Sequence, residues 1–222
     1  MVLLVVGLGL AVVEVAGLRS PENPYILCSR DVAKGSEAAK KLREQAVTAP
    51  IHFYQLDVTN DEEITALVDY VDKIHGRVDV SVNNAGILRG MDMPPDAPAS
   101  ALRAAYTEAL NVNVTSVAVV THAFMPVLRK APNPKVINVT SGLGCITNVL
   151  TPGKRMARAC PRVAENDRAA VASGGAGAAE GGSSVRFYIC NPGQGAESIV
   201  RIVEDDEGMY EGGMYWEFED GR

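Results

Sequence analysis

Two glycines near the start of the chain could hold the phosphates of a nucleotide. Gly7 and Gly9 separate an apolar, strand-like run at residues 2–6 from a helix-like run at residues 10–18. Glycine lets a pyrophosphate approach the backbone amides at the positive N-terminus of a helix. A Gly-x-Gly pair is also common where a helix packs closely on its neighbours, so both interpretations are open from the sequence.

A small polar turn at residues 83–86, Asn-Asn-Ala-Gly, could lie against a flat cofactor. It ends a run in which Val78, Val80 and Val82 predict a short buried strand. Asn tolerates left-handed backbone, and Gly allows another group to come close. Ligands of an open α/β sheet bind just beyond the carboxyl ends of its strands, so this turn is a candidate cofactor contact. An ordinary strand-to-helix turn is the alternative.

Arg30 and Asp31 follow a predicted strand at residues 25–28 and bear on the choice of cofactor. An acidic residue at this strand end would bond the ribose hydroxyls of NAD, whereas a basic residue accommodates the 2′-phosphate of NADP. The guanidinium of Arg30 suits a phosphate, and Asp31 is equally well placed to cap the next helix. We therefore expect NADP rather than NAD; the alternative is that Arg30 is an ordinary solvated charge.

The apolar runs predict an α/β fold, a Rossmann-like doubly wound parallel sheet in a single domain over residues 1–222. The chain has 222 residues, of which 47% are hydrophobic and 22% charged, which is enough for one globular core. Strands are expected at residues 2–6, 25–28, 51–56, 78–82, 135–140, 185–190 and, as an edge strand, 213–219. Residues 151–184 are irregular and Gly-rich and are expected to be a flexible segment inside the domain.

The helix expected after residue 60 shows the helical pattern most clearly. Thr59 and Glu62 have the spacing of a capping box, and Gly76 is placed to end the helix. A core stripe with helical spacing is predicted at Ile64, Leu67, Val68, Val71 and Ile74.

Charge and cysteine content exclude several classes of function. The net charge of −6 and a pI near 5.2 argue against nucleic-acid and membrane partners. The four cysteines form no C-x-x-C pair and predict buried thiols in a reducing compartment, so we expect a cytoplasmic protein. The three histidines fall in different predicted elements and suggest no metal site. The apolar first 18 residues contain Glu14 and no Lys or Arg, so we do not expect an export signal.

Four motifs in the same order resemble those of the short-chain dehydrogenase/reductase family, and in particular its carbonyl-reductase-like members. The turn at residues 83–86 is similar to the one that ends the family's fourth strand. Residues 56–59, 111–114 and 136–142 match the flanking motifs. The resemblance implies a Rossmann-like fold and an NADP(H)-dependent oxidoreductase that acts on a small-molecule carbonyl or alcohol.

The resemblance also implies roles for individual residues. Ser141 matches the catalytic serine, which stabilises charge on the substrate oxygen; local backbone bonding is its alternative. Asn113 matches an Asn that kinks its helix and holds a water of the proton relay; an Asn facing solvent or making a local bond is the alternative. Cofactor contacts are expected at Gly7, Gly9, Arg30, Asp57, Val58, Asn84, Ala85, Gly86, Pro192 and Gly193.

The family's Tyr-x-x-x-Lys pair has no counterpart in this sequence. The first tyrosine after Ser141 is Tyr188, which lies in a predicted strand and has Pro192 four places on. Lys154 and Arg158 have the helical spacing but no phenol. The glycine-rich motif is shortened as well, because only its last Gly-x-Gly is present. We therefore expect impaired catalysis; the alternative is a non-catalytic nucleotide-binding or truncated member with no turnover.

The missing helix bears on assembly too. In the family, the helix that carries Tyr-x-x-x-Lys also builds the dimer interface. A homo-oligomer of the family's type is thus left open by the sequence.

Overall fold

The described part of the chain forms one parallel sheet. The computed structural model describes residues 1–7, 9–90, 93–140, 185–191, 196–205 and 215–217. The strand order is β3-β2-β1-β4-β5-β6-β7, and every neighbouring pair is parallel. The strands are β1 (Leu3–Val6), β2 (Tyr25–Ser29), β3 (Ile51–Gln55), β4 (Val80–Asn83), β5 (Lys135–Val139), β6 (Arg186–Asn191) and β7 (Tyr215–Glu217). The predicted doubly wound α/β fold is confirmed.

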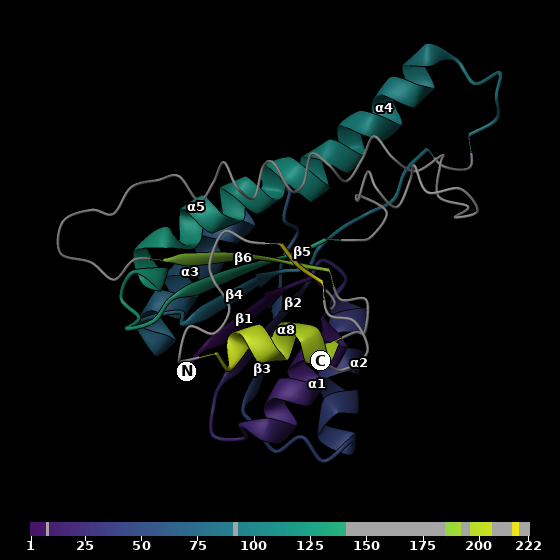
Figure 1. Ribbon diagram of the computed structural model, residues 1–222. Helices are drawn as coiled ribbons and strands as arrows, with labels where there is room; N and C mark the ends of the chain where they lie inside the picture. The colour runs from purple at the N-terminus through teal and green to yellow at the C-terminus, as the bar shows by residue number, and fades with distance from the viewer. Residues whose placement is uncertain (8, 91–92, 141–184, 192–195, 206–214, 218–222) are drawn as a thin grey trace.

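Helices cover both faces of the sheet (Figure 1). On one face lie α1 (Leu10–Arg19), α2 (Val32–Glu44) and α8 (Ala196–Val203). On the other lie α3 (Asp61–His75) and α5 (Ser116–Leu128), while α4 (Ala99–Leu110) continues the line of α5 beyond the sheet. Connections that alternate faces in this way bury a parallel sheet on both sides.

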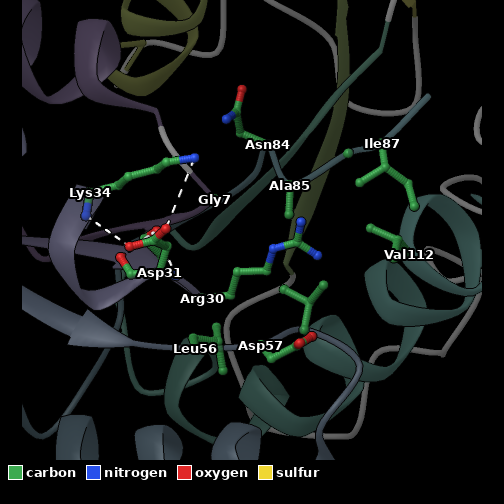
Figure 2. A pocket seen from close by; sticks show the side chains of 13 residues that line it. Gly7, Arg30, Asp31, Lys34, Leu56, Asp57, Asn84, Ala85, Ile87 and Val112 are labelled. Carbon is green, nitrogen blue, oxygen red and sulfur yellow. Dashed lines mark hydrogen bonds and ion pairs between the residues drawn. The ribbon is translucent and has the colours of Figure 1, made fainter. Parts of the chain in front are cut away.

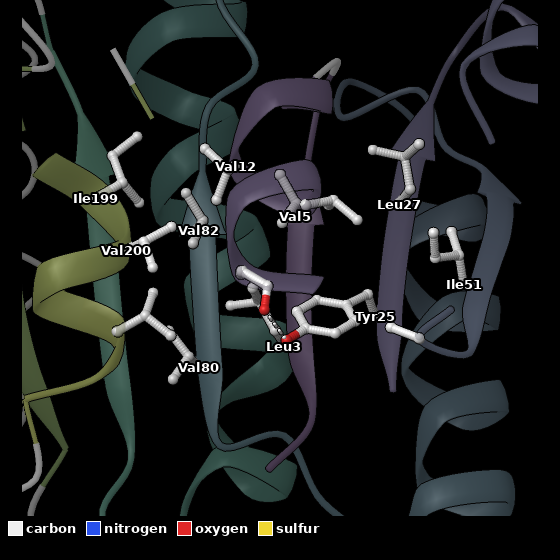
Figure 3. Packing of buried hydrophobic residues seen from close by; sticks show 14 of the residues in the cluster. Leu3, Val5, Val12, Tyr25, Leu27, Ile51, Val80, Val82, Ile199 and Val200 are labelled. Carbon is white, nitrogen blue, oxygen red and sulfur yellow. Dashed lines mark hydrogen bonds between the residues drawn. The ribbon is translucent and has the colours of Figure 1, made fainter. Parts of the chain in front are cut away.

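Alternate residues of β1 enter two separate cores. Leu3 and Val5 pack with α1, α2 and α8, whereas Leu4 and Val6 pack with α3 and α5. Figure 3 shows the first of these cores around Tyr25. The Tyr25 hydroxyl donates to the carbonyl of Ala16 at 2.8 Å, and burial raises its pKa to about 12. The continuous apolar run of β1 therefore reflects a strand buried on both faces.

Cys28 lies in the second core and is a free thiol, and burial raises its pKa. A buried thiol was predicted for this cysteine, and a raised pKa keeps such a thiol in its unreactive protonated form. Cys145 and Cys160 lie outside the described residues.

Two predictions about α3 are wrong. Asn60 rather than Thr59 caps the helix, because its side chain accepts from the N–H groups of Glu62 and Glu63. Glu63, not Glu62, reaches back, and its carboxylate accepts from the N–H of Asp57 at 2.6 Å. Ile74 is 53% exposed, so the buried stripe of α3 ends at Val71. Gly76 does end the helix, in a left-handed conformation with φ 73°.

The helix that carries Asn113 is interrupted. A π-helical turn, η1 (Asn111–Thr115), separates α4 from α5. By length and composition, residues 99–128 are the one helix in the described ranges that could cross a membrane, and 33% of its most apolar window is buried. Val120, Phe124 and Leu128 pack in the core, which accounts for much of this apolar character.

Helix α8 is anchored to the sheet by a buried lysine. Lys135 is 1% exposed, and its ammonium donates to the carbonyls of Ile202, Val203 and Asp205 at 3.2, 2.9 and 2.5 Å. These are carbonyls at the negative end of α8, where a cation is favourable. Asp205 itself is 6% exposed, so this acidic residue is buried rather than solvated.

Candidate functional site

A cavity of about 430 Å³ opens at the carboxyl ends of β1, β2, β3 and β4 (Figure 2). The strand order reverses at β1, because β2 lies on one side of it and β4 on the other. This switch point is where open α/β sheets bind ligands, and the volume suits a nucleotide. Seven of the ten predicted cofactor residues line the cavity: Gly7, Arg30, Asp57, Val58, Asn84, Ala85 and Gly86.

Gly7 has a backbone that requires glycine. Its φ is 91°, and a Cβ added there would lie 2.6 Å from the N of Ala85. The loop after β1 is therefore in van der Waals contact with the turn after β4. Gly7 packs closely on a neighbouring loop and also lines the cavity. A role in packing and a role beside a nucleotide are therefore compatible for this residue.

Gly9 is a packing glycine. It precedes the first residue of α1, and a Cβ added there would lie 2.3 Å from Cγ1 of Val5. Its N–H donates to the carbonyl of Gly7 at 2.7 Å. Gly9 is not among the residues that line the cavity.

Two basic side chains, from the end of β2 and the first turn of α2, line the cavity. Arg30 points into the cavity, and Lys34, one helical turn later, lies with Asp31 at its edge (Figure 2). Asp31 caps α2, because its Oδ1 accepts from the N–H of Lys34 at 3.0 Å. Its other carboxylate oxygen lies 4.0 Å from Nζ of Lys34. Lys34 was not predicted as a site residue; its place in the first turn of α2, three residues after the capping residue Asp31, is the signal that could have identified it.

Asp57 contributes a carboxylate to the wall of the cavity. The hydroxyl of Thr59 donates to Oδ1 of Asp57 at 2.7 Å, and the Thr59 N–H donates to the same atom at 2.9 Å. These hydrogen bonds lower the pKa of Asp57, and the charge of Arg30 adds a smaller contribution. Asp57 is thus held as an anion that can accept a hydrogen bond from an amino group.

Asn113 joins the π-helical turn to the loop after β4. Its Nδ2 donates to the carbonyl of Ile87 at 2.9 Å, and its Oδ1 accepts from the Ile87 N–H at 2.8 Å. The partner lies 26 residues away, so the alternative of a local or solvent-facing Asn is wrong. Val112, its neighbour in η1, lines the cavity. The side chain therefore holds one wall of the cavity in place, and a part in proton transfer stays a prediction.

A pair of buried amides lies beneath the cavity and was not predicted. Nδ2 of Asn83 donates to Oδ1 of Asn138 at 2.7 Å and to the hydroxyl of Thr121 at 3.1 Å. Asn83 is 4% exposed and Asn138 is 6% exposed. These bonds link the ends of β4 and β5 to α5. The signal in the sequence is an Asn at or next to the last residue of each of two strands that are mostly apolar.

Part of the predicted site lies outside the described residues, namely Ser141, Pro192, Gly193 and residues 151–184. Tyr188 lies in β6, as predicted. In the described ranges, no three His, Cys, Asp or Glu side chains are grouped to hold a metal ion. The rings of His52 and His75 do meet edge to face, with centroids 5.6 Å apart.

The fold resembles that of known reductases. Salutaridine reductase from Papaver somniferum aligns with a TM-score of 0.74 over 98% of this chain and 99% of that chain, at 19% identity. Menthone neomenthol reductase from Mentha piperita aligns with a TM-score of 0.71 at 20% identity, over 96% of this chain and 97% of that chain. At such identities the likeness concerns the fold alone.

The sequence comparisons identify the family. Residues 4–152 match the family model for short chain dehydrogenase. A short-chain dehydrogenase/reductase of Aspergillus fumigatus is 48% identical over 248 aligned positions, which cover 97% of this chain and 91% of that protein. The alignment is longer than the chain, so that relative has residues that this chain lacks. Carbonyl reductase [NADPH] 3 of Rattus norvegicus is 33% identical over 59% of this chain and 44% of that protein. The chain belongs to the short-chain dehydrogenase/reductase family of oxidoreductases.

Proposed function

We propose that this chain binds NADP(H) and acts as a carbonyl or alcohol oxidoreductase with impaired turnover. The observation that carries the proposal is the pairing of Arg30 and Lys34 at the end of β2, where they line the cavity. A guanidinium and an ammonium at this strand end suit the 2′-phosphate of NADP. The relatives named as NADPH carbonyl reductases, from Rattus norvegicus and Sus scrofa, support the same cofactor and substrate class.

The described residues fit the adenosine half of the cofactor. Arg30 and Lys34 would hold the 2′-phosphate, and the ionised carboxylate of Asp57 would accept from the adenine amino group. Asn84 and Ala85 offer a flat wall, which Asn113 keeps in place through Ile87. The bound nicotinamide would supply the hydride. The chain's own part is to orient the cofactor and to exclude water from one side of it.

We expect impaired turnover because the sequence lacks the Tyr-x-x-x-Lys pair of the family. No tyrosine in the 222 residues has a lysine four places later. Ser141 would still polarise a substrate carbonyl, but the general acid of the family has no counterpart. General acid–base catalysis contributes about a hundredfold to ten-thousandfold, so we expect turnover to be lower than that of complete family members by that factor.

Two titrations test the proposal. NADPH and NADH are added to the full chain while nicotinamide fluorescence is followed, and NADPH is expected to bind more tightly. Arg30→Ala should weaken NADPH binding about tenfold or more, because a charge-assisted contact to phosphate is lost. Lys41→Ala, which removes an exposed charge in the last turn of α2, should leave binding unchanged. Equal affinity for NADH and NADPH would contradict the assignment of the cofactor.

Turnover is tested separately with a panel of aldehydes and ketones. Slow oxidation of NADPH that Ser141→Ala abolishes supports the oxidoreductase. Binding without turnover favours the alternative of a nucleotide-binding member with no activity. Turnover at the rate of complete family members would contradict the proposed impairment.

A further inference from the structure

We infer that His52 and His75 form a binding site for a divalent late transition-metal ion, represented by Zn²⁺, between β3 and α3. The inference stands independently of the proposed function. The two imidazoles would be the protein ligands, and water would complete the coordination of the ion. A site with two protein ligands agrees with the finding that no three potential ligand side chains are grouped in the described ranges.

The fold brings the two histidines together from separate elements. His52 is the second residue of β3 and pairs in register with Ile26, which packs in the core beneath α3. Neighbours in register point to the same face of a sheet, so His52 also faces α3, and His75 is the last residue of that helix. The pair therefore lies at the end of the sheet opposite the cavity. The separate elements of the histidines suggested no metal site in the sequence, because their meeting depends on the fold.

The spacing of the two rings suits one shared ion. Their centroids lie 5.6 Å apart, and their planes make an angle of 70°. Two imidazoles that bind one ion at about 2.1 Å in a tetrahedral arrangement have ring centres roughly 5 to 6 Å apart. The nitrogen lone pairs lie in the plane of each ring, so those of two inclined rings can converge on one point. Rings stacked face to face could not share an ion in this way.

A ring nitrogen of the pair is buried without a partner. Within the described part of the chain, Nε2 of His75 has no hydrogen bond although it is shielded from solvent. A buried polar atom of this kind calls for a bound ion or water to satisfy it. His52 and His75 are each only partly buried as whole residues, so an ion can approach the pair from solvent.

The surroundings favour a cation and hold one ring in place. His75 lies at the C-terminal end of α3, where backbone carbonyls carry partial negative charge. The ring of Tyr70 meets that of His75 with centroids 6.5 Å apart, and Tyr54 packs on Tyr70 at 5.3 Å. These contacts restrict the His75 ring, so less rotamer entropy is lost when an ion binds. The nearby charge of Arg77 is balanced by Asp79, at 3.2 Å.

Calorimetric titration of the full chain with ZnCl₂ tests the inference. His52→Phe and His75→Phe keep an aromatic ring but remove the nitrogens, and each should weaken Zn²⁺ binding about tenfold or more. The double variant should bind about as weakly as either single variant, because one substitution already destroys a shared site. His122→Phe changes the third histidine of the chain, which is exposed on α5, and should leave binding unchanged.

NMR titration of the imidazole groups makes the same test without any substitution. Zn²⁺ should shift the ring signals of His52 and His75 over the same range of concentration and leave those of His122 in place. MgCl₂ should leave all three in place, because Mg²⁺ prefers oxygen ligands.

The outcomes bear on the metal site alone. Zn²⁺ binding that persists at full strength in both single variants overturns the inference, and so do NMR shifts confined to one ring of the pair or to His122. Equal responses to Zn²⁺ and Mg²⁺ overturn it as well. NADPH titration of the same variants should match that of the unchanged chain, so a failure of the metal site and a failure of the proposed cofactor are told apart.

Discussion

Lys34 and Lys135 show how differently one side chain is used at two places in this molecule. Lys34 is exposed at the edge of the cavity, 4.0 Å from Asp31. Lys135 is 1% exposed and is bound to three carbonyls at the end of α8. A solvated ammonium can exchange water for a phosphate at little cost, whereas a buried one is committed to its partners. The region around Lys135 holds the fold together, and the region around Lys34 is open to a ligand.

The largest expected effect comes from removing the buried lysine. Lys135→Met leaves carbonyls of α8 without a donor and should lower the free energy of unfolding by about 3 to 5 kcal/mol. Urea unfolding measures this change. Lys130→Met removes an exposed partner of Asp72 and should cost no more than about 1 kcal/mol. NADPH binding by the folded Lys135→Met protein should be unchanged; a strong loss of binding would show that the two regions are coupled.

Gly7→Ala should affect both regions at once. The new Cβ meets the backbone of Ala85 and has an unfavourable φ, so we expect a loss of about 2 to 3 kcal/mol in stability. NADPH binding should weaken as well, because the wall of the cavity moves. Gly76→Ala is the control, since its φ is also positive but the space around it is open. It should cost about 1 to 2 kcal/mol and leave NADPH titrations unchanged.

Asn113→Ala should loosen one wall of the cavity. Two hydrogen bonds to the backbone of Ile87 are lost, which should lower stability by about 1 to 2 kcal/mol. We expect a weaker NADPH affinity because the loop after β4 is no longer held. Asn111→Ala changes an exposed residue of the same turn and is the comparison in both urea unfolding and NADPH titration. An equal effect of both variants would contradict a specific role for Asn113.

The smallest effect concerns the ionisation of Asp57. The pKa of this carboxyl is lowered in the folded state, so its contribution to stability is present above the unfolded value of about 3.9 and is lost as the pH falls through the folded pKa. Thr59→Val removes the hydroxyl that donates to it and should raise the pKa of Asp57. The cost at pH 7 should be no more than about 0.5 kcal/mol and should become smaller once the pH is below the folded pKa of Asp57. NMR titration of the carboxyl measures this, and Thr65→Val should leave it unchanged.

The elements and most of the cavity wall could be predicted because their signals are local. The apolar run of β1, the turn at residues 83–86 and the basic residue after β2 each report on a few neighbouring positions. Parallel strands place their carboxyl ends at one edge of the sheet, so residues that end separate strands meet there. The cap of α3 was misplaced by one residue because Thr59 and Asn60 are both good capping residues, and only the backbone conformation selects between them.

From sequence alone, hydrophobic periodicity and turn chemistry predicted the doubly wound sheet and the edge of the sheet where the cavity lies, and the resemblance of four motifs indicated the family. Only the folded chain could decide which polar groups meet across long separations. Asn113 forms hydrogen bonds with Ile87, which is 26 residues away, and Asn83 forms one with Asn138, which is 55 residues away. Lys135 forms hydrogen bonds with carbonyls at the end of α8, about 70 residues away. The physical reason is that a polar side chain needs a specific partner at about 3 Å, and such a distance is set by the packing of whole elements rather than by any local pattern.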